Sequence, residues 1–304
     1  MTIYLGIDGG GTKTTCVVAD DTVTLGSATT GGSNITRHGD SHVRESLHSA
    51  VKAACAAAKV EPSQIESACI GLSGAGRPEV RDAVADMMRE LLRGQILVVS
   101  DLETTLQAAF GDGPGVITIA GTGSIAYGRD ARGQTARAGG WGLAISDEGS
   151  GQWIGRTAVS AVLGAKDAGD DPPLLAPILK LWKLNSLDEL VRRANGSPPP
   201  DFSSLFRSVV DAASAGDSLA RQLLEQAGLE LSALARNVIR RLFADGASVP
   251  VAMSGGVFRQ AEAIRQVFYN KLAAEFPQAS IQTVVVEPVR GALELARKAM
   301  ASKS

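Results

Sequence analysis

The start of the chain is rich in apolar and β-branched side chains with the spacing of β-strands. Residues 3–8 and 14–19 have this pattern and are separated by Gly9-Gly10-Gly11, which predicts two strands joined by a glycine hairpin. A turn at Asp20-Asp21 precedes a third predicted strand over residues 22–28. The chain is therefore expected to open with a three-stranded meander.

Helical spacing follows this meander. The apolar positions of residues 43–54 fall on one face at a period near 3.6, and those of residues 80–91 do the same. Short apolar runs at 68–72 and 96–99 follow these helices and predict two more strands. Strands that alternate with helices indicate a mixed sheet covered by helices, so the expected fold class is α/β.

The second half of the chain repeats this opening pattern. Strands are predicted at 116–119 and 125–127, on either side of the turn at 121–124, and a turn at 130–133 leads to a third short strand. The repeat predicts two similar domains with a border near 111–115.

The remainder of the second half predicts mostly helix. Residues 151–243 have helical spacing, interrupted by the pair Pro172-Pro173 and the triplet at 198–200, which end helices. A strand at 249–254, a helix at 258–276 and a strand at 281–286 come next, followed by a short terminal helix. We therefore expect an N-terminal domain over 1–112 and a C-terminal domain over 113–288.

Composition excludes several classes of protein. With 44% hydrophobic residues the 304-residue chain can bury a full core, and its net charge of −2 without a long basic run argues against a nucleic-acid partner. No apolar run is long enough to span a membrane, and the first is too short for a signal peptide. The odd number of widely spaced cysteines, Cys16, Cys55 and Cys69, fits reduced thiols in the cytoplasm.

The segment from Asp8 to Thr14 has the chemistry of a phosphate site. A carboxylate ends the predicted strand, and three glycines follow, whose backbone N–H groups can approach a phosphate closely. Asp8 would then hold Mg²⁺ through water. An ordinary hairpin turn is the alternative interpretation, because glycine and aspartate are also the preferred turn residues.

Two known nucleotide motifs do not fit the glycine segments. Residues 6–13 nearly match a P-loop, but Thr12 stands where its lysine is required. Residues 121–126 match a dinucleotide fingerprint, yet the segment that follows predicts a strand rather than the required helix. We therefore expect neither a P-loop nor NAD.

The set of glycine turns resembles that of the superfamily of sugar kinases, actin and heat-shock chaperone ATPases. Asp8 to Thr14 and Ala120 to Ser124 resemble its two phosphate segments, and Ser254 to Phe258 resembles its adenosine-contacting turn. The resemblance implies two ribonuclease H-like domains of the actin/sugar-kinase type, each with a mixed five-stranded sheet flanked by helices, and ATP in the cleft between them. It also implies that the terminal helix, about 289–304, packs back on the first domain.

Within the superfamily, nearly the whole chain resembles the N-acetylglucosamine kinase family, which belongs to the BadF/BadG/BcrA/BcrD-type ATPase group. Gly139 to Gly142 and Ser146 to Ser150 resemble its GGWG and DEGS signatures, although Ser146 stands where the family often has glycine. Gly31 to Asn34 resembles the loop whose asparagine contacts sugar hydroxyls. Asp101, after the strand at 96–99, resembles the catalytic base.

Each assignment has a structural alternative. Asp101 is also placed to cap a helix that starts at Leu102, and Asp147 to cap one that starts near Ser150. We expect Asp101 to be catalytic and Asp147 to accept hydrogen bonds from sugar hydroxyls. Trp141 is expected to be a packing residue, although an indole can also form a wall of a sugar pocket.

The complete predicted site combines these segments. ATP is expected at Gly9, Gly10, Gly11, Thr12, Lys13, Thr14, Gly121, Thr122, Gly123, Gly255 and Gly256, with Mg²⁺ at Asp8. The sugar is expected at Asn34, Asp101, Ser124, Gly140, Trp141, Gly142 and Asp147.

The resemblance implies ATP-dependent phosphorylation of N-acetylglucosamine at O6, with glucosamine, N-acetylmuramic acid and glucose as alternative substrates. A reductase-activating ATPase is a second hypothesis, but it needs cysteines in suitable loops for an iron–sulfur cluster. Among the histidines, His38 is expected in a loop, and His42 and His48 on the solvated surface of a helix. A homodimer is compatible with the sequence.

Overall fold

The computed structural model describes residues 2–35 and 39–301. The chain divides into two compact units: unit 1 consists of Met1–Gly113 and Val286–Ser304, and unit 2 of Pro114–Val285. The sequence pattern placed the corresponding borders at 112 and 288.

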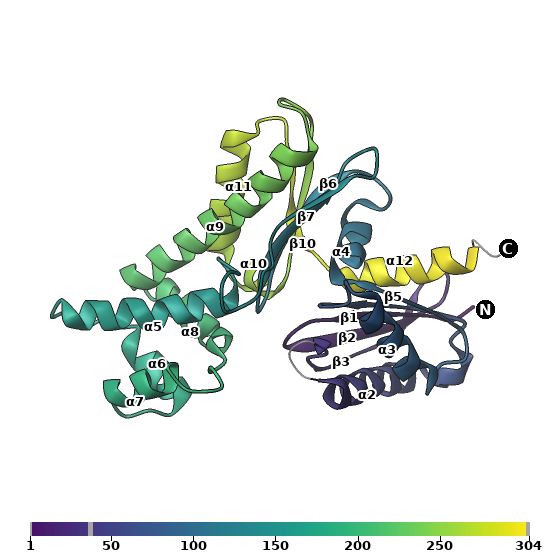
Figure 1. Ribbon diagram of the computed structural model, residues 1–304, viewed down its shortest axis with the longest axis horizontal. Coiled ribbons are helices and arrows are strands. Elements are labelled where there is room, and N and C mark those ends of the chain that lie inside the picture. Colours follow the sequence, from purple (N-terminus) through teal and green to yellow (C-terminus); the bar gives the residue numbers. More distant parts are fainter. Residues whose placement is uncertain (1, 36–38, 302–304) are drawn as a thin grey trace. The chain divides into compact units, whose positions relative to one another are not determined.

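Unit 1 is built on a mixed five-stranded sheet (Figure 1). Its order is β3-β2-β1-β4-β5; β2 is antiparallel to both β1 and β3, whereas β1, β4 and β5 run parallel. The strands are β1 (Tyr4–Gly9), β2 (Lys13–Ala19), β3 (Thr24–Gly31), β4 (Ser67–Leu72) and β5 (Gln95–Ser100). The predicted meander and both later strands are confirmed.

Helices cover both faces of this sheet. Because side chains alternate along a strand, Leu5 and Ile7 pack in one core with α2 (Asp40–Ala58) and α3 (Pro78–Arg89). Tyr4 packs on the other face with α12 (Pro288–Ala301), and α4 (Asp101–Phe110) lies beside α12 (Figure 1). A 3₁₀ helix, η1 (Pro62–Gln64), precedes β4.

The close approach of α12 to the sheet depends on Gly6. A Cβ atom at Gly6 would lie 2.9 Å from the backbone N of Leu293. Leu293 itself is buried, as are its helix neighbours Ala292 and Ala296. The terminal helix is thus a packed part of unit 1.

Unit 2 repeats the sheet in the order β10-β9-β6-β7-β8. β6, β7 and β8 form an antiparallel meander, and β9 is parallel to β6. The strands are β6 (Gly115–Ala120), β7 (Ser124–Arg129), β8 (Thr135–Gly139), β9 (Pro250–Ser254) and β10 (Ser280–Val286). The expected duplication of a mixed five-stranded sheet is confirmed.

Most of unit 2 outside the sheet is helical, as its spacing predicted. The long helix α9 packs across β6, β7 and β8 and lies beside α11 (Figure 1). Phe202 and Phe206 are buried in its core. The helices are α5 (Gly151–Asp167), α6 (Leu175–Trp182), α7 (Leu187–Ala194), η2 (Phe202–Leu205), α8 (Phe206–Ser214), α9 (Ser218–Leu242), α10 (Gly256–Gln260) and α11 (Glu262–Glu275).

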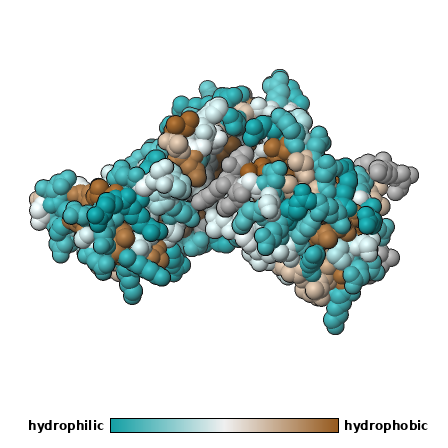
Figure 2. All heavy atoms as spheres, turned by 60° about the horizontal axis from the view of Figure 1, so that its bottom comes forward, coloured by the Kyte–Doolittle hydropathy of each residue, from teal (hydrophilic) through white to brown (hydrophobic). Residues whose placement is uncertain are grey.

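Hydrophilic residues predominate on the face shown in Figure 2, where hydrophobic residues form only small groups. Among the described residues, no helix combines the length and apolar character needed to cross a bilayer.

Candidate active site

The first glycine turn connects β1 and β2 and is tightly packed on one side. A Cβ atom at Gly9 would lie 2.1 Å from Ser33 Oγ, so the turn requires glycine there. The N–H of Gly10 donates to the carbonyl of Lys13 at 2.9 Å, which closes the hairpin. The carbonyl of Gly10 accepts from the N–H groups of Ser33 (3.0 Å) and Asn34 (3.2 Å). The turn and the loop that carries Asn34 therefore form one unit.

The residues of this turn fall into an accessible tip and a buried end. Thr12 and Lys13 are exposed, whereas Thr14 is fully buried. Thr14 Oγ1 lies 2.7 Å from the Gly31 carbonyl and 2.8 Å from Ser33 Oγ. The Thr14 side chain thus supports the loop after β3.

Asp101 lies at the carboxyl edge of the unit 1 sheet, where parallel strands present the residues that follow them. β4 and β5 pair Leu72 with Ser100, so Ser73 and Asp101 leave the sheet together. Ser73 donates a side-chain hydrogen bond to the Asp101 carboxylate and accepts one from Asn34 Nδ2 at 3.1 Å. The structure thereby brings together two predicted site residues, Asn34 and Asp101, through a serine that the sequence analysis missed.

The electrostatic surroundings of Asp101 raise its pKa to about 7. Burial of the carboxyl group is the largest cause, and the negative charge of Asp8 adds to it. The N–H groups of Leu102 and Asp101 and the Ser73 hydroxyl act in the opposite direction. The residue keeps partial access to solvent. Such a carboxyl group can accept a proton near neutral pH, which is what a general base requires.

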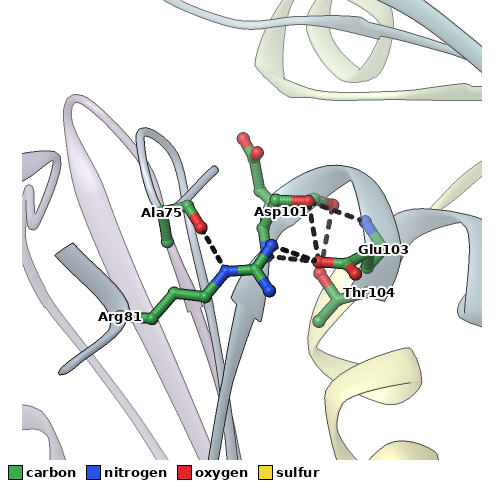
Figure 3. Close-up of polar contacts among 6 residues, drawn as sticks. Ala75, Arg81, Asp101, Glu103 and Thr104 are labelled. Atoms are coloured by element: carbon green, nitrogen blue, oxygen red, sulfur yellow. Dashed lines mark hydrogen bonds and ion pairs between the residues drawn. The ribbon is translucent and has the colours of Figure 1, made fainter. Parts of the chain in front are cut away.

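Asp101 does not cap helix α4. The N-cap is Ser100, whose Oγ accepts from the Glu103 N–H while Glu103 Oε2 accepts from the Ser100 N–H at 2.8 Å. The structure thus rules out the capping alternative for Asp101. In Figure 3 the Asp101 carboxylate points away from Arg81 and Glu103.

The second glycine turn connects β6 and β7 and rests on the first residues of α5. The N–H of Gly121 donates to the Gly123 carbonyl at 2.9 Å, and the Gly151 N–H donates to the Gly121 carbonyl at 2.8 Å. The Gln152 N–H reaches the Thr122 carbonyl at 3.3 Å. This turn is therefore anchored by α5 in unit 2, just as the first turn is anchored by its loop in unit 1.

Asp147 packs directly on this second turn. A Cβ atom at Gly123 would lie 2.9 Å from Asp147 Oδ2, and the Ser124 N–H donates to the Asp147 carboxylate. Asp147 has φ 69° and is only 5% exposed, and burial raises its pKa. Ser124 Oγ also donates to the Glu148 carbonyl at 2.7 Å. The segment after Ser146 is thus tied to the glycine turn.

Asp147 is not the cap of α5 either. Ser150 is the N-cap, and its Oγ accepts from the Trp153 N–H at 3.2 Å. The structure thus rules out the capping alternative for Asp147 as well.

The segment from Gly139 to Gly142 has an unusual backbone and an exposed aromatic ring. Gly139, Gly140 and Gly142 all have positive φ, which favours glycine. Trp141 is 62% exposed, so it is not the buried packing residue that was expected. The Arg137 guanidinium carbon lies 4.0 Å from the Trp141 ring centroid, a cation–π contact that covers part of the indole.

The third glycine turn follows β9. Gly255 has φ 101°, and a Cβ atom there would lie 2.2 Å from the Ala120 carbonyl oxygen, at the end of β6. Gly256 is the first residue of α10. The second and third glycine turns, which both belong to unit 2, are therefore neighbours at one edge of its sheet.

The cysteines lie inside unit 1. All three are buried; burial raises the pKa of Cys55 to about 11 and that of Cys69 to about 12, and it raises that of Cys16 further. Thiols in such positions do not fit the ligands of an iron–sulfur cluster that is shared between subunits.

One histidine differs from its expected place. His48 is not solvated: its Nε2 lies 2.8 Å from the Met87 carbonyl, and its side chain is 16% exposed. The adjacent Met87 and Met88 are buried, as predicted. His42 is exposed, and the predicted loop position of His38 lies outside the described residues.

Comparison with known proteins gives consistent matches over nearly the whole chain. The profile of the BadF/BadG/BcrA/BcrD ATPase family matches residues 5–296. The N-acetylmuramic acid/N-acetylglucosamine kinase of Clostridium acetobutylicum is 33% identical over 302 residues, which is 98% of this chain and 99% of that protein. The N-acetyl-D-glucosamine kinase of Dictyostelium discoideum is 29% identical over 97% of both chains.

Among solved structures, a candidate N-acetylglucosamine kinase from Chromobacterium violaceum superposes with a TM-score of 0.78 and 27% identity. The match covers 97% of this chain and 99% of the other. This similarity confirms the expected fold with two duplicated domains.

Proposed function

The chain belongs to the BadF/BadG/BcrA/BcrD ATPase family, and on that premise we propose that it transfers the γ-phosphoryl group of ATP to an amino sugar. N-acetylglucosamine, phosphorylated at O6, is the substrate that the relatives support best, since those at 33% and 29% identity are kinases that act on this sugar. The observation that carries the proposal is Asp101, whose pKa is raised to about 7 at the carboxyl end of the parallel strands β4 and β5.

Asp101 is the proposed general base. It accepts the proton of the sugar hydroxyl as that oxygen attacks the γ-phosphorus of ATP, and the bond to the β-phosphate oxygen breaks. Ser73 and the Leu102 N–H orient the carboxylate and stabilise its charged form. The proton therefore moves to a group whose pKa suits neutral pH.

The glycine turns are the proposed phosphate ligands. In unit 1 the proposed ligand is the turn at Gly10 to Lys13 with its exposed lysine, and in unit 2 it is the turn at Gly121 to Gly123. Support comes from the close packing of both turns, since a Cβ atom would lie 2.1 Å from Ser33 Oγ at Gly9 and 2.9 Å from Asp147 Oδ2 at Gly123. The turn at Gly255-Gly256 is proposed to contact the adenosine.

Mg²⁺ is the proposed cofactor, with Asp8 as its protein ligand. Asp8 stands at the end of β1, directly before the glycine turn, and carboxylate oxygen suits this hard cation. The bound ion would neutralise charge on the phosphates. Asp8 is thus proposed to hold Mg²⁺, and Asp101 to accept the proton of the sugar hydroxyl.

The sugar is proposed to contact Asn34, Ser124, Gly140, Trp141, Gly142 and Asp147 in addition to Asp101. The Asn34 amide is oriented by its bond to Ser73. Trp141 presents an exposed indole, a surface on which a sugar ring packs well. Asp147 is fixed by the Ser124 N–H and would offer its remaining acceptor capacity to sugar hydroxyls.

We further propose that the protein works in the cytoplasm, where its three buried free thiols remain reduced. A homodimer is proposed as well, and size-exclusion chromatography coupled to light scattering tests it.

A coupled assay of ATP consumption with N-acetylglucosamine, glucosamine, N-acetylmuramic acid and glucose tests the function. The expected result is sugar-dependent turnover, highest with N-acetylglucosamine, and a 6-phosphate product in the ³¹P NMR spectrum. ATP turnover that no sugar stimulates would contradict the proposal and favour a partner-activating ATPase.

A further inference from the structure

The position of Asp101 depends on two separate pieces of backbone. One is the first turn of α4, where Asp101 is the first helical residue. The other is the turn after β4, which carries Ser73, the hydrogen-bond donor to the Asp101 carboxylate. A change in the distance between these two pieces would pull the carboxylate away from its donor.

Arg81 of α3 connects the two pieces. Its Nε donates to the carbonyl of Ala75, in the turn after β4, at 2.7 Å. Its Nη2 lies 3.6 Å from Glu103 Oε2, which is in the first turn of α4. Figure 3 shows the guanidinium between Ala75 on one side and Glu103 on the other. The planar guanidinium has donors on separate nitrogens and can contact both partners at once, whereas the ammonium of lysine has a single nitrogen.

Glu103, which contacts Arg81, also binds the residue before Asp101. Its Oε2 accepts from the Ser100 N–H at 2.8 Å and from Ser100 Oγ at 3.1 Å. The carbonyl of Asp101 is held in turn by Thr105 Oγ1 at 2.6 Å and Thr104 Oγ1 at 3.1 Å. The backbone on both sides of the Asp101 side chain is thus fixed, and the Arg81 contact relates it to the turn that carries Ser73.

We propose that Arg81 and Glu103 are positioning residues that hold Asp101 against Ser73 in the geometry needed for proton abstraction. The proposal rests on the proposed function of Asp101 as the base. Because the Asp101 carboxylate points away from both side chains (Figure 3), their effect on it passes through the backbone. On its other side, α4 faces α12. There Gln107 Nε2 donates to Glu294 Oε2, and Lys298 forms an ion pair with Asp112. Gln107 and Asp112 both come later in the chain than Asp101, so neither contact involves its side chain.

The ion pair is suited to this role rather than to stabilising the fold. The side chains of Arg81 and Glu103 are 39% and 43% exposed, and pairs of this kind contribute little to folding. Arg89, on the same helix, provides a matched control, because its exposed ion pair with Asp86 lies within α3 and joins no other segment.

The test compares Arg81→Gln, Glu103→Ala and Glu103→Gln with Arg89→Gln. For Arg81→Gln we expect kcat for sugar phosphorylation to fall on the order of 10-fold, because small displacements of a catalytic group are costly. The KM values for ATP and sugar should stay within about twofold, because neither residue is proposed to bind substrate. Arg89→Gln should match the wild type.

Three further results are expected. Glu103→Gln should lose less activity than Glu103→Ala, because glutamine keeps an acceptor for the Ser100 N–H. Arg81→Lys should remain impaired, because lysine lacks the fork. The double variant Arg81→Gln/Glu103→Ala should lose less activity than the product of the two single losses, because the two residues act in one connection.

Amide hydrogen exchange measures the connection independently of activity. In Arg81→Gln the backbone amides of residues 101–105 should exchange faster than they do in the wild type and in Arg89→Gln. The melting temperature should be unchanged. If exchange and kcat of Arg81→Gln both equal those of Arg89→Gln, the positioning role is wrong. If the wild type phosphorylates no sugar, the proposed function fails, and the exchange data alone then decide whether Arg81 fixes the first turn of α4.

Discussion

Asp8 lies near enough to Asp101 for its negative charge to raise the pKa of the Asp101 carboxyl group. Asp8 is the residue before the last of β1, and Asp101 is the first residue of α4, directly after β5. In the sheet, β4 lies between β1 and β5. Their repulsion favours a proton on Asp101 in the free protein. A cation bound at Asp8 would weaken that repulsion, so the proposed metal and the proposed base are electrostatically coupled.

The pH dependence of catalysis follows from the pKa of about 7 of Asp101. A base must be deprotonated to act, so kcat/KM should rise as the pH increases from 5.5 to 8.5, with a midpoint near that pKa. The measurement is an initial-rate profile at constant ionic strength. A profile that is flat between pH 5.5 and 8.5 would exclude Asp101 as the titrating base.

The same pKa predicts that Asp101 costs folding stability at high pH. Its carboxyl group keeps a proton to about pH 7 in the folded protein, whereas the ordinary value, and hence that of the unfolded chain, is 3.8. Between these values the folded state binds more protons, so stability falls as the pH rises from about 4 to 7 and stays lowered above it.

Asp101→Asn removes this cost because asparagine does not ionise. Thermal unfolding without ligands should show the variant more stable than the wild type at pH 8, by at least about 2 °C. The difference should shrink as the pH falls and vanish only well below pH 3.8, where the wild-type group is protonated in both states. Equal melting temperatures at pH 8 would mean that the carboxylate is not destabilised by its surroundings.

The first glycine turn allows a comparison of two alanine substitutions. At Gly9 a Cβ atom would lie 2.1 Å from Ser33 Oγ, whereas at Gly31 no atom lies within 4 Å. Gly9→Ala should therefore destabilise unit 1 by about 1–3 kcal/mol and weaken ATP binding, while Gly31→Ala should have a small effect on stability. Urea unfolding and calorimetric ATP titration measure the two quantities. Similar losses for both variants would show that the turn is not sterically restricted.

Asp147 allows backbone strain to be separated from sugar binding. Its φ of 69° and its bond from the Ser124 N–H predict that Asp147→Ala loses stability, by about 1–3 kcal/mol. Asp147→Asn should be milder, because asparagine tolerates this φ and keeps an acceptor. If the carboxylate also binds the sugar, both variants should raise the KM for the sugar and leave that for ATP unchanged. An unchanged sugar KM in both would remove Asp147 from the proposed site.

Much of this arrangement was predictable because local patterns determine it. The spacing of apolar residues predicts the strands of both meanders and the helices that follow them. The glycines predict the tight turns between the strands. Even the Ser100 cap was readable, because serine followed three residues later by glutamate is the sequence of a capping box. The helix boundary was nevertheless expected one residue too late, which made Asp101 itself a candidate cap.

Other features depend on the register between strands and could not be read from one segment. Ser73 reaches Asp101 only because β4 and β5 pair Leu72 with Ser100. Arg81 lies within the helix predicted over residues 80–91, but its contacts with Ala75 and Glu103 join three separate segments. Trp141 was expected to be a packing residue, yet it is 62% exposed, in a segment whose glycines have positive φ values.

The most direct test of the central claim is the kcat of Asp101→Asn with N-acetylglucosamine and ATP. Asparagine keeps the size of the side chain but cannot take the proton, so kcat should fall by about 10²–10⁴-fold, while calorimetry shows ATP affinity close to that of the wild type. A folded Asp101→Asn protein that phosphorylates the sugar within a few-fold of the wild-type rate would contradict the assignment of Asp101 as the base.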